Sequence, residues 1–435
     1  MKKIISALTL GAMVCGAVFA DVSLNLNYRQ RANLYTSYER GDKYTLFNNA
    51  YSGAGTDNLA LSMSGDIVSF DVTLVGDQSA TTNIRAKTLG ASVFLGNWTV
   101  FGGFWSDGKL NGAYRTKSDV DAGNIEGMDF EFKKLGSAFG ASPAFFADNM
   151  VMPVNTKNES YSLGVTYAVP NINNGALKVN AVYITNEITE SGSDKAATAS
   201  GMLQGHTGVL LLDGRLDGLG QGEVVFKYGQ SGLNDGDGKD GATAMVFGAY
   251  VQPSIAKNLI LTVGGAGSVV DGDFTDYSVD LRARYQVIPK KLSITSFHSY
   301  SALVDGEESA VSNKTTKGIA DDSMPSKAKD LGKLGGTPIQ RDQVMSNNLM
   351  VRYNVNDKLS VFGIVADMIG MGDNMGVEVD DIQVQLRMSG WAQFFASNSA
   401  TVTAGVVCAI DNVNEGNDKD SYTTWGIPVV LRVKM

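Results

Sequence analysis

The sequence predicts an all-β fold: a transmembrane antiparallel β-barrel of about 18 strands, within a range of 16 to 18. Three observations favour this class. Side chains alternate between apolar and polar with a period of two, the alternating segments are long, and short connections alternate with long ones. Strands of soluble domains average ~5–6 residues, whereas a tilted strand needs ~9–11 residues to cross a bilayer.

The alternation is clearest in residues 276–287. Every odd position there carries an apolar or aromatic side chain, and every even position carries a polar or charged one. Residues 161–169 and 421–435 repeat the pattern. Successive side chains of a strand point to opposite faces, so each of these segments has one apolar and one polar face.

The connections between the alternating segments fall into two classes of length. The predicted strands span residues 22–38, 57–65, 67–76, 86–95, 98–107, 158–169, 175–187, 206–216, 220–230, 242–252, 258–269, 275–287, 290–303, 346–355, 358–369, 379–390, 400–410 and 421–435. Short links such as 65–66 and 96–97 alternate with long ones such as 108–157 and 304–345. Short turns on one rim and long loops on the other are typical of bacterial membrane barrels, whose short turns face the periplasm.

Aromatic residues on the apolar faces are spaced to suit a membrane. Tyr161 and Tyr167 are six residues apart, and Tyr277 and Tyr285 are eight apart. At ~3.3 Å per residue these separations are about 20 and 26 Å. The apolar band between the two aromatic girdles of a membrane barrel is ~25 Å tall.

Residues 1–20 are predicted to be a signal peptide. Lys2 and Lys3 precede an apolar stretch, and Val18-Phe19-Ala20 provides a cleavage site with small residues. Residues 21–435 are then a single barrel domain. Of the two cysteines, Cys15 lies in the leader and only Cys408 remains, so no intrachain disulfide is expected.

Several classes of function are disfavoured. A net charge of −9 argues against a nucleic-acid partner, because such binding depends on basic patches. Residues 234–241 partly resemble a calcium loop, but Lys239 stands where an oxygen ligand is needed, so no metal or other cofactor is predicted. His206 and His298 are the only histidines, and no nucleophile elbow is present, so no catalytic residues and no enzyme activity are predicted.

The leader, strand length, loop asymmetry and aromatic spacing together resemble the bacterial outer-membrane porins. The resemblance implies a porin in the outer membrane of a double-membraned (Gram-negative-type) bacterium, forming a water-filled channel for passive diffusion of small hydrophilic solutes. It also implies contact with outer-membrane lipid, recognition by the barrel assembly machinery and a possible homotrimer. The chain departs from the pattern at its last residue, because Met435 stands where such barrels usually carry an aromatic residue.

Two alternatives remain at this stage. Barrels that transport hydrophobic solutes of the fatty-acid type have a folded N-terminal plug with an Asn-Pro-Ala tripeptide, whereas here Val22 begins a strand at once. A surface-exposed adhesin or antigen barrel would instead use its long loops, such as 304–345.

The polar faces of the predicted strands supply the candidate pore-lining residues. Charges on the lipid face would cost ~2–4 kcal/mol at mid-depth, so alternation places them inside. The candidates are Arg29, Arg31, Asp71, Lys178, Asp213, Arg215, Glu223, Lys227, Asp280, Arg282, Arg284, Arg352, Arg387 and Arg432. Basic groups facing acidic ones would bias the flow of ions, although pairing between them would serve structure alone.

The long third loop, 108–157, is a candidate constriction folded into the lumen, with an external lid as the alternative. Its acidic rim would come from Asp119, Asp121, Glu126, Asp129 and Glu131.

Overall fold

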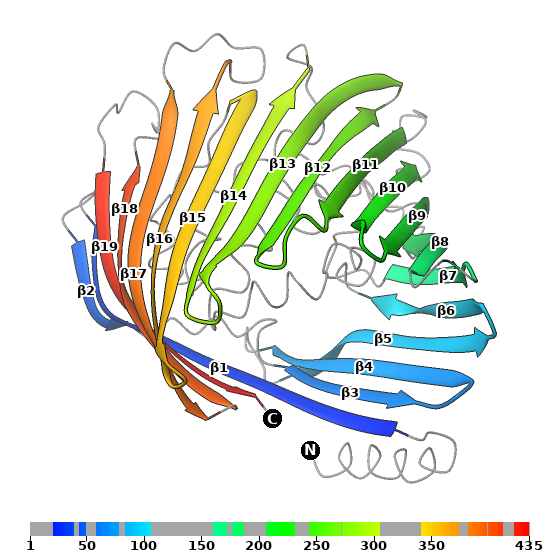
Figure 1. Cartoon of the computed structure of the whole chain (residues 1–435), viewed down its shortest axis with the longest axis horizontal. Coiled ribbons are helices and arrows are strands. Elements are labelled where there is room, and N and C mark those ends of the chain that lie inside the picture. Colours follow the sequence, from blue (N-terminus) through cyan, green and yellow to red (C-terminus); the bar gives the residue numbers. More distant parts are fainter. Residues whose placement is uncertain are drawn as a thin grey trace, which may run out of the picture.

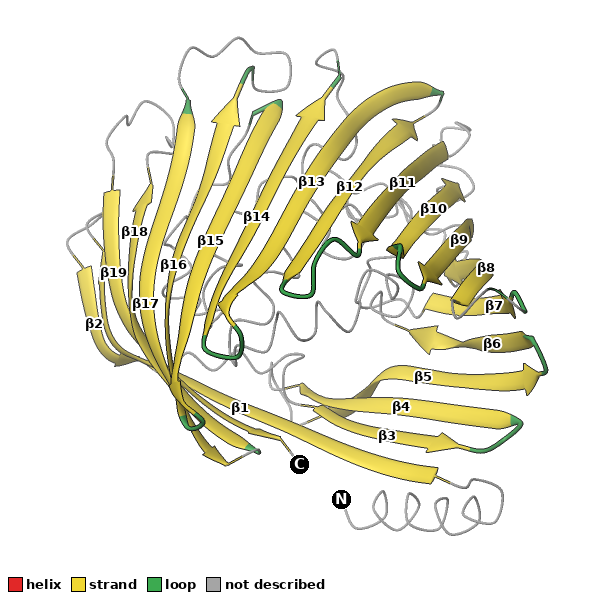
Figure 2. Ribbon diagram, in the orientation of Figure 1, coloured by secondary structure: helices red, strands yellow, loops and turns green. Residues whose placement is uncertain are grey.

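The computed structural model describes residues 21–38, 43–48, 58–77, 83–105, 160–170, 172, 176–186, 206–230, 243–270, 272–304, 341–373, 382–397, 399–411 and 422–434. These residues form nineteen antiparallel strands joined by tight turns (Figures 1 and 2). Within them, no helix has the length and apolar content that a membrane crossing requires.

The strands are long. They are β1 (Asp21–Tyr38), β2 (Lys43–Asn48), β3 (Asn58–Ser64), β4 (Val68–Asp77), β5 (Asn83–Leu95), β6 (Trp98–Trp105), β7 (Ser160–Ala168), β8 (Ala176–Asn186), β9 (His206–Leu216), β10 (Gly220–Gln230), β11 (Thr243–Pro253), β12 (Leu259–Val270), β13 (Asp273–Ile288), β14 (Leu292–Leu303), β15 (Gln343–Asn356), β16 (Leu359–Met371), β17 (Gln383–Ser397), β18 (Ala400–Asp411) and β19 (Tyr422–Lys434). The all-β antiparallel fold expected from the alternation is confirmed.

The first strand closes the sheet. From β3 onward each strand pairs with the next in sequence, and β19 pairs back onto β1. Asn27 in β1 lies opposite Lys434 of β19 and also opposite Asn58 of β3. A strand residue has only two neighbouring strands, so β19 and β3 lie on opposite edges of β1 and the ladder returns to its start. Figure 1 shows β1, in dark blue, reaching from β19 and β2 to β3.

The structure departs most from the predicted strands in two places. The interval 39–56, predicted to be a loop, contains β2, which pairs with the outer end of β1 on the edge opposite β19. Because β2 and β3 share that edge, the nineteen strands occupy eighteen positions around the ring. The strand predicted to end at residue 390 continues to Ser397. The alternation there is inverted: Trp391 lies on the polar face and small Ala392 on the apolar one, so the pattern concealed the strand.

Most short connections lie at one rim, although the short connections 78–82 and 271–272 join strands at the other rim. Short connections follow β3, β5, β7, β9, β11, β13, β15 and β17, so β1 begins and β19 ends at this same rim. The opposite connections lie largely outside the described residues. The turns at this short-turn rim use backbone conformations that favour glycine, with φ of 65° at Gly96 and 122° at Gly220.

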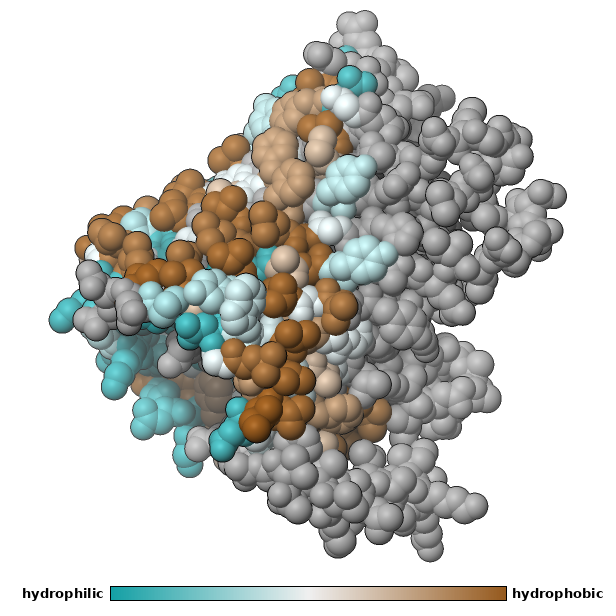
Figure 3. All heavy atoms as spheres, turned by 90° about the vertical axis from the view of Figure 1, so that its right-hand side faces the viewer, coloured by the Kyte–Doolittle hydropathy of each residue, from teal (hydrophilic) through white to brown (hydrophobic). Residues whose placement is uncertain are grey.

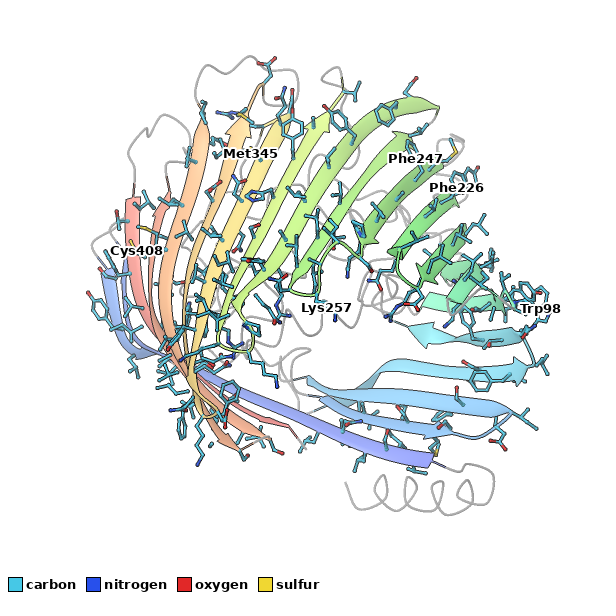
Figure 4. All side chains as sticks on the ribbon, viewed as in Figure 1. Trp98, Phe226, Phe247, Lys257, Met345 and Cys408 are labelled. Atoms are coloured by element: carbon cyan, nitrogen blue, oxygen red, sulfur yellow. The ribbon has the colours of Figure 1, made fainter. Side chains whose placement is uncertain are left out.

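The two faces of the sheet differ in polarity. Side chains such as Val224, Val251 and Val279 are about half exposed, at 51, 52 and 51%. They belong to a face that is apolar over many strands, and Figure 3 shows hydrophobic residues spread across it on the side at the right of Figure 1. Trp98, on the same face, points out of the ring in Figure 4. We call this face the outer face and the opposite one the inner face.

Aromatic residues mark both ends of the outer face. Trp98 and Tyr167 meet near the short-turn rim, with ring centroids 4.5 Å apart. Tyr277 and Tyr300 meet near the other rim, with centroids 6.2 Å apart. Tyr277 and Tyr285 both lie on the outer face, as their spacing predicted. The side chain of Tyr161 lies outside the described part.

Gly220 is the turn residue most sensitive to substitution. A Cβ there would overlap the carbonyl oxygen of Gln252 and would sit at a φ that other residues avoid. We expect Gly220→Ala to lower the free energy of unfolding by about 2 kcal/mol or more, measured by urea unfolding from lipid vesicles. Gly96→Asn is the control, because its turn has open space and a φ that Asn tolerates. Equal unfolding midpoints for the two variants would contradict this account of the turn.

Candidate functional site

The inner face carries the candidate pore-lining positions. Residues directly opposite each other in an antiparallel ladder share a face, so the register assigns the face from strand to strand. The positions are Arg29 and Arg31 in β1, Asp71 in β4, Lys178 in β8, Asp213 and Arg215 in β9, Glu223 and Lys227 in β10, Asp280, Arg282 and Arg284 in β13, Arg352 in β15, Arg387 in β17 and Arg432 in β19. The register puts all of these backbone positions on the face opposite the exposed apolar side chains. Ten of them are basic and four are acidic.

The ladder brings some of these positions together. Lys178 lies opposite Asp213, which in turn lies opposite Glu223. Arg29 lies opposite Arg432, so two arginine positions adjoin where the ladder closes. The side chains of Lys178, Arg215, Arg284 and Arg352 are described, and those of the other ten candidates are not. A pore-lining role for the set therefore remains a prediction.

Arg352 is held firmly in the inner wall. Its Nη2 donates to the hydroxyl of Ser360 at 3.0 Å and to Oε1 of Gln393 at 3.3 Å, and its Nε donates to Oδ1 of Asn354 at 3.1 Å. Its guanidinium carbon also lies 6.0 Å from the centre of the Phe395 ring. Three strands thus fix one positive charge on this wall.

Near Arg352 lies a group of buried polar side chains that the sequence reading missed. Thr295 in β14, Asn348 in β15 and Ser389 and Trp391 in β17 all have polar atoms with no hydrogen-bond partner. Their side chains are 2, 1, 9 and 4% exposed, respectively. All four lie on the inner face, and we call them the unpaired polar cluster. Single polar residues in a strand pattern do not reveal whether they will find a partner, so no sequence signal distinguished them.

The unpaired polar cluster has apolar surroundings. Met350 lies directly opposite Thr295 and Ile364 directly opposite Ser389, and both Met350 and Ile364 are fully buried. The rings of Phe362 and Trp391 stack with centroids 6.3 Å apart at an angle of 16°. A buried polar group without a partner costs ~1–3 kcal/mol. Polar atoms of this cluster therefore lower the stability of the fold.

A second polar group missed by the sequence reading lies on the outer face. Nδ1 of His298 in β14 is 2.7 Å from Oδ1 of Asn347 in β15, and Nδ2 of Asn347 donates to Oδ1 of Asp367 in β16 at 2.7 Å. An amide oxygen only accepts, so the His298 ring donates this bond. Leu281 opposite His298 and Leu349 beside Asn347 are exposed, which places the trio among apolar side chains. Asn347 and Asn348 are adjacent and both polar, so the alternation of the sequence did not show which of them lies on the outer face.

Some predicted features fall outside the described residues. They are the signal peptide, the loop 108–157 with its acidic residues, and the segment 234–241. Among the residues that the structure describes, no group of three or more His, Cys, Asp or Glu side chains could hold a metal ion.

Solved structures of outer-membrane proteins align with this chain over nearly its whole length. OpdO of Pseudomonas aeruginosa covers 96% of this chain and 98% of its own, at 10% identity and a TM-score of 0.49. The outer membrane channel DcaP of Acinetobacter baumannii covers 96% and 98%, at 12% identity and a TM-score of 0.42. OmpT of Vibrio cholerae, in a trimer form, covers 95% and 99%, at 10% identity and a TM-score of 0.39. No family model and no curated protein matches the sequence. The resemblance is remote and holds at the level of the structural class.

The outer-face trio makes a testable prediction about stability. Asn347→Leu leaves both His298 and Asp367 without their partner, so we expect it to lower the free energy of unfolding by about 1–3 kcal/mol in urea titrations from vesicles. Replacing all three residues together (His298→Phe, Asn347→Leu and Asp367→Leu) makes this face uniformly apolar and should recover that loss. A triple variant less stable than Asn347→Leu alone would contradict the placement of the trio on an apolar face.

Proposed function

We propose that this chain is an outer-membrane porin, a water-filled channel through which small hydrophilic solutes diffuse passively. The observation that carries the proposal is a closed ladder of strands with an apolar outer face and charged positions on its inner face. The chain would be exported by its signal peptide and inserted by the barrel assembly machinery. No catalytic step is proposed.

The outer face supports the membrane part of the proposal. Half-exposed aliphatic side chains over many strands are unfavourable in water and favourable against lipid tails. Hydrocarbon offers no partner for backbone groups, so a spanning sheet must pair every strand on both sides. The ladder meets that requirement by returning to β1, and β2, which shares an edge of β1 with β3, is the one strand for which the described residues show pairing on a single edge.

The ring size supports the channel part. Barrels of about eight strands are filled by their own side chains, whereas porins of 16–18 strands leave an aqueous channel. The inner positions of this ring include Lys178 and Arg215, both exposed. The loop 108–157 would narrow the lumen, and a homotrimer would be a natural assembly for such a protein.

The charges of the inner wall set the expected selectivity. The candidate positions are ten basic and four acidic, and Asp276 and Asp411 add two acids on the same face, so basic positions remain in excess and favour anions even though the whole chain has a net charge of −9. Charged walls of one sign concentrate ions of the opposite sign. We therefore propose that the channel prefers small anions to small cations.

Planar lipid bilayers test the channel directly. Purified protein should add conductance in discrete steps, and a gradient of potassium chloride should give a reversal potential of the sign that anion preference requires. Folded protein that inserts without ever conducting would overturn the proposal.

Charge variants test the selectivity of the same channel. Lys178→Gln with Arg215→Gln should lower the anion-to-cation permeability ratio by roughly two-fold, and Asp213→Asn with Glu223→Gln should raise it. Lys358→Gln is the matched control, because this exposed lysine lies in the turn between β15 and β16. If both double variants shifted the permeability ratio in the same direction, or if Lys358→Gln shifted it equally, the charges of the inner wall would not set the selectivity.

A further inference from the structure

Lysines gather on one side of the short-turn rim, in the three consecutive turns that join β11 to β12, β13 to β14 and β15 to β16. They are Lys257 (Figure 4), Lys290, Lys291 and Lys358, and all four are exposed. We call them the basic arc. Neighbouring turns of this rim are two strands apart, or about 10 Å.

The rest of the rim has a different charge. The short turns between β3 and β10 contain Asp66 and Asp217 and no lysine or arginine. The three turns of the basic arc contain one acid, Asp357, against four lysines. A charge that served only general solubility would not need to concentrate on one side of the ring.

The turn between β13 and β14 is fixed to the next strand by Asn354 of β15. Its backbone nitrogen donates to the carbonyl oxygen of Lys291 at 2.8 Å, and its Nδ2 donates to the carbonyl oxygen of Lys290 at 2.6 Å. The backbone nitrogen of Lys291 also donates to the carbonyl oxygen of Ile288 at 3.0 Å. These bonds hold the backbone of two adjacent lysines in one place.

Lys290 has an unfavourable backbone conformation. Its φ is 61°, and among the described residues every other positive φ belongs to a glycine. Glycine or asparagine adopts this conformation at a lower cost than lysine does. Strain of this kind persists mainly where the side chain has a role, and the only chemistry that a lysine side chain adds here is a positive charge.

The basic arc borders the outer face. The ammonium group of Lys291 lies 5.5 Å from the centre of the Tyr353 ring, and Tyr353 is an exposed residue of that face. Aromatic rings at the edge of the apolar band mark the depth of the lipid headgroups. Ile288 and Val355 are exposed apolar residues beside this contact. A phospholipid could therefore place its phosphate at the lysines and its acyl chains against the outer face.

We infer that the basic arc binds the headgroup of an anionic phospholipid. The inference rests on the proposed outer-membrane location, in which the short-turn rim faces the periplasm and the lipid belongs to the periplasmic leaflet. Basic residues at a membrane surface attract anionic lipids, and each lysine strengthens the attraction roughly five-fold. The position of Lys291 against a residue of the outer face favours a lipid over a soluble partner.

The test titrates the purified protein in detergent with phosphatidylglycerol or with zwitterionic phosphatidylcholine, and measures bound lipid by native mass spectrometry. The wild type should bind phosphatidylglycerol more tightly than phosphatidylcholine. Lys290→Asn, Lys291→Gln and Lys358→Gln together should weaken binding of phosphatidylglycerol by at least ~10-fold. Lys291→Gln alone, which leaves the strained position unchanged, should weaken it roughly five-fold.

Urea unfolding from vesicles separates lipid binding from folding. In phosphatidylcholine vesicles the triple variant should keep or raise the unfolding midpoint, because asparagine tolerates the backbone conformation at position 290. Adding phosphatidylglycerol to the vesicles should raise the midpoint of the wild type and not that of the triple variant. An equal rise in both proteins would overturn the inference.

Lys178→Gln with Arg215→Gln is the matched control, because it removes positive charge from the inner wall and should leave the affinity for phosphatidylglycerol unchanged. Equal loss of affinity in this control would overturn the assignment to the basic arc. Displacement of phosphatidylglycerol by soluble glycerol 3-phosphate would identify a site for free phosphate and overturn the assignment to lipid.

Failure of the lipid site and failure of the porin give different results. A protein that conducts in discrete steps but binds both lipids equally overturns the lipid site and leaves the porin intact. A protein that never conducts but keeps its preference for phosphatidylglycerol overturns the porin alone, because binding at the rim does not depend on an open lumen.

Discussion

Pairing of backbone groups on both edges of every strand is the constraint on which this structure depends. Hydrocarbon cannot hydrogen-bond a peptide group, so an open edge in lipid would be prohibitively costly. The chain meets the constraint through β1, whose residue Asn27 pairs with both β3 and β19. A closed ring has an outer and an inner face, so its apolar side chains can face lipid while its charged positions lie inside. It also has two rims, whose connections differ in length.

The inner wall divides into two regions of different character. On β8–β10 the exposed Lys178 and Arg215 alternate with acidic positions. On β14–β17 the wall is largely buried, with aromatic and aliphatic side chains around polar atoms that lack partners. The first region is suited to biasing the flow of ions.

The sequence predicted the parts of the fold that period-two alternation controls. The bounds of β9 and β10 agreed residue for residue, and the facing of Tyr277 and Tyr285 followed from their spacing. Alternation failed where a strand carries a bulky apolar residue on its inner face, as Trp391 does. It also failed for β2, whose six residues are too few to stand out from a loop. Alternation could not predict the side-chain contacts of the candidate sites. Whether Asn347 and Asn348 find hydrogen-bond partners depends on the residues of the neighbouring strands and not on the pattern of polar and apolar residues in β15.

The most direct test measures which environment each face of one strand meets. With Cys15 and Cys408 replaced by Ser, single cysteines at residues 224 to 228 of β10 can carry a nitroxide spin label in lipid vesicles. The account predicts that labels at Val224, Phe226 and Tyr228 collide with oxygen dissolved in lipid, and that labels at Val225 and Lys227 collide with an aqueous nickel chelate. Uniform exposure of all five labels to the aqueous chelate would contradict a closed sheet with its apolar face in lipid.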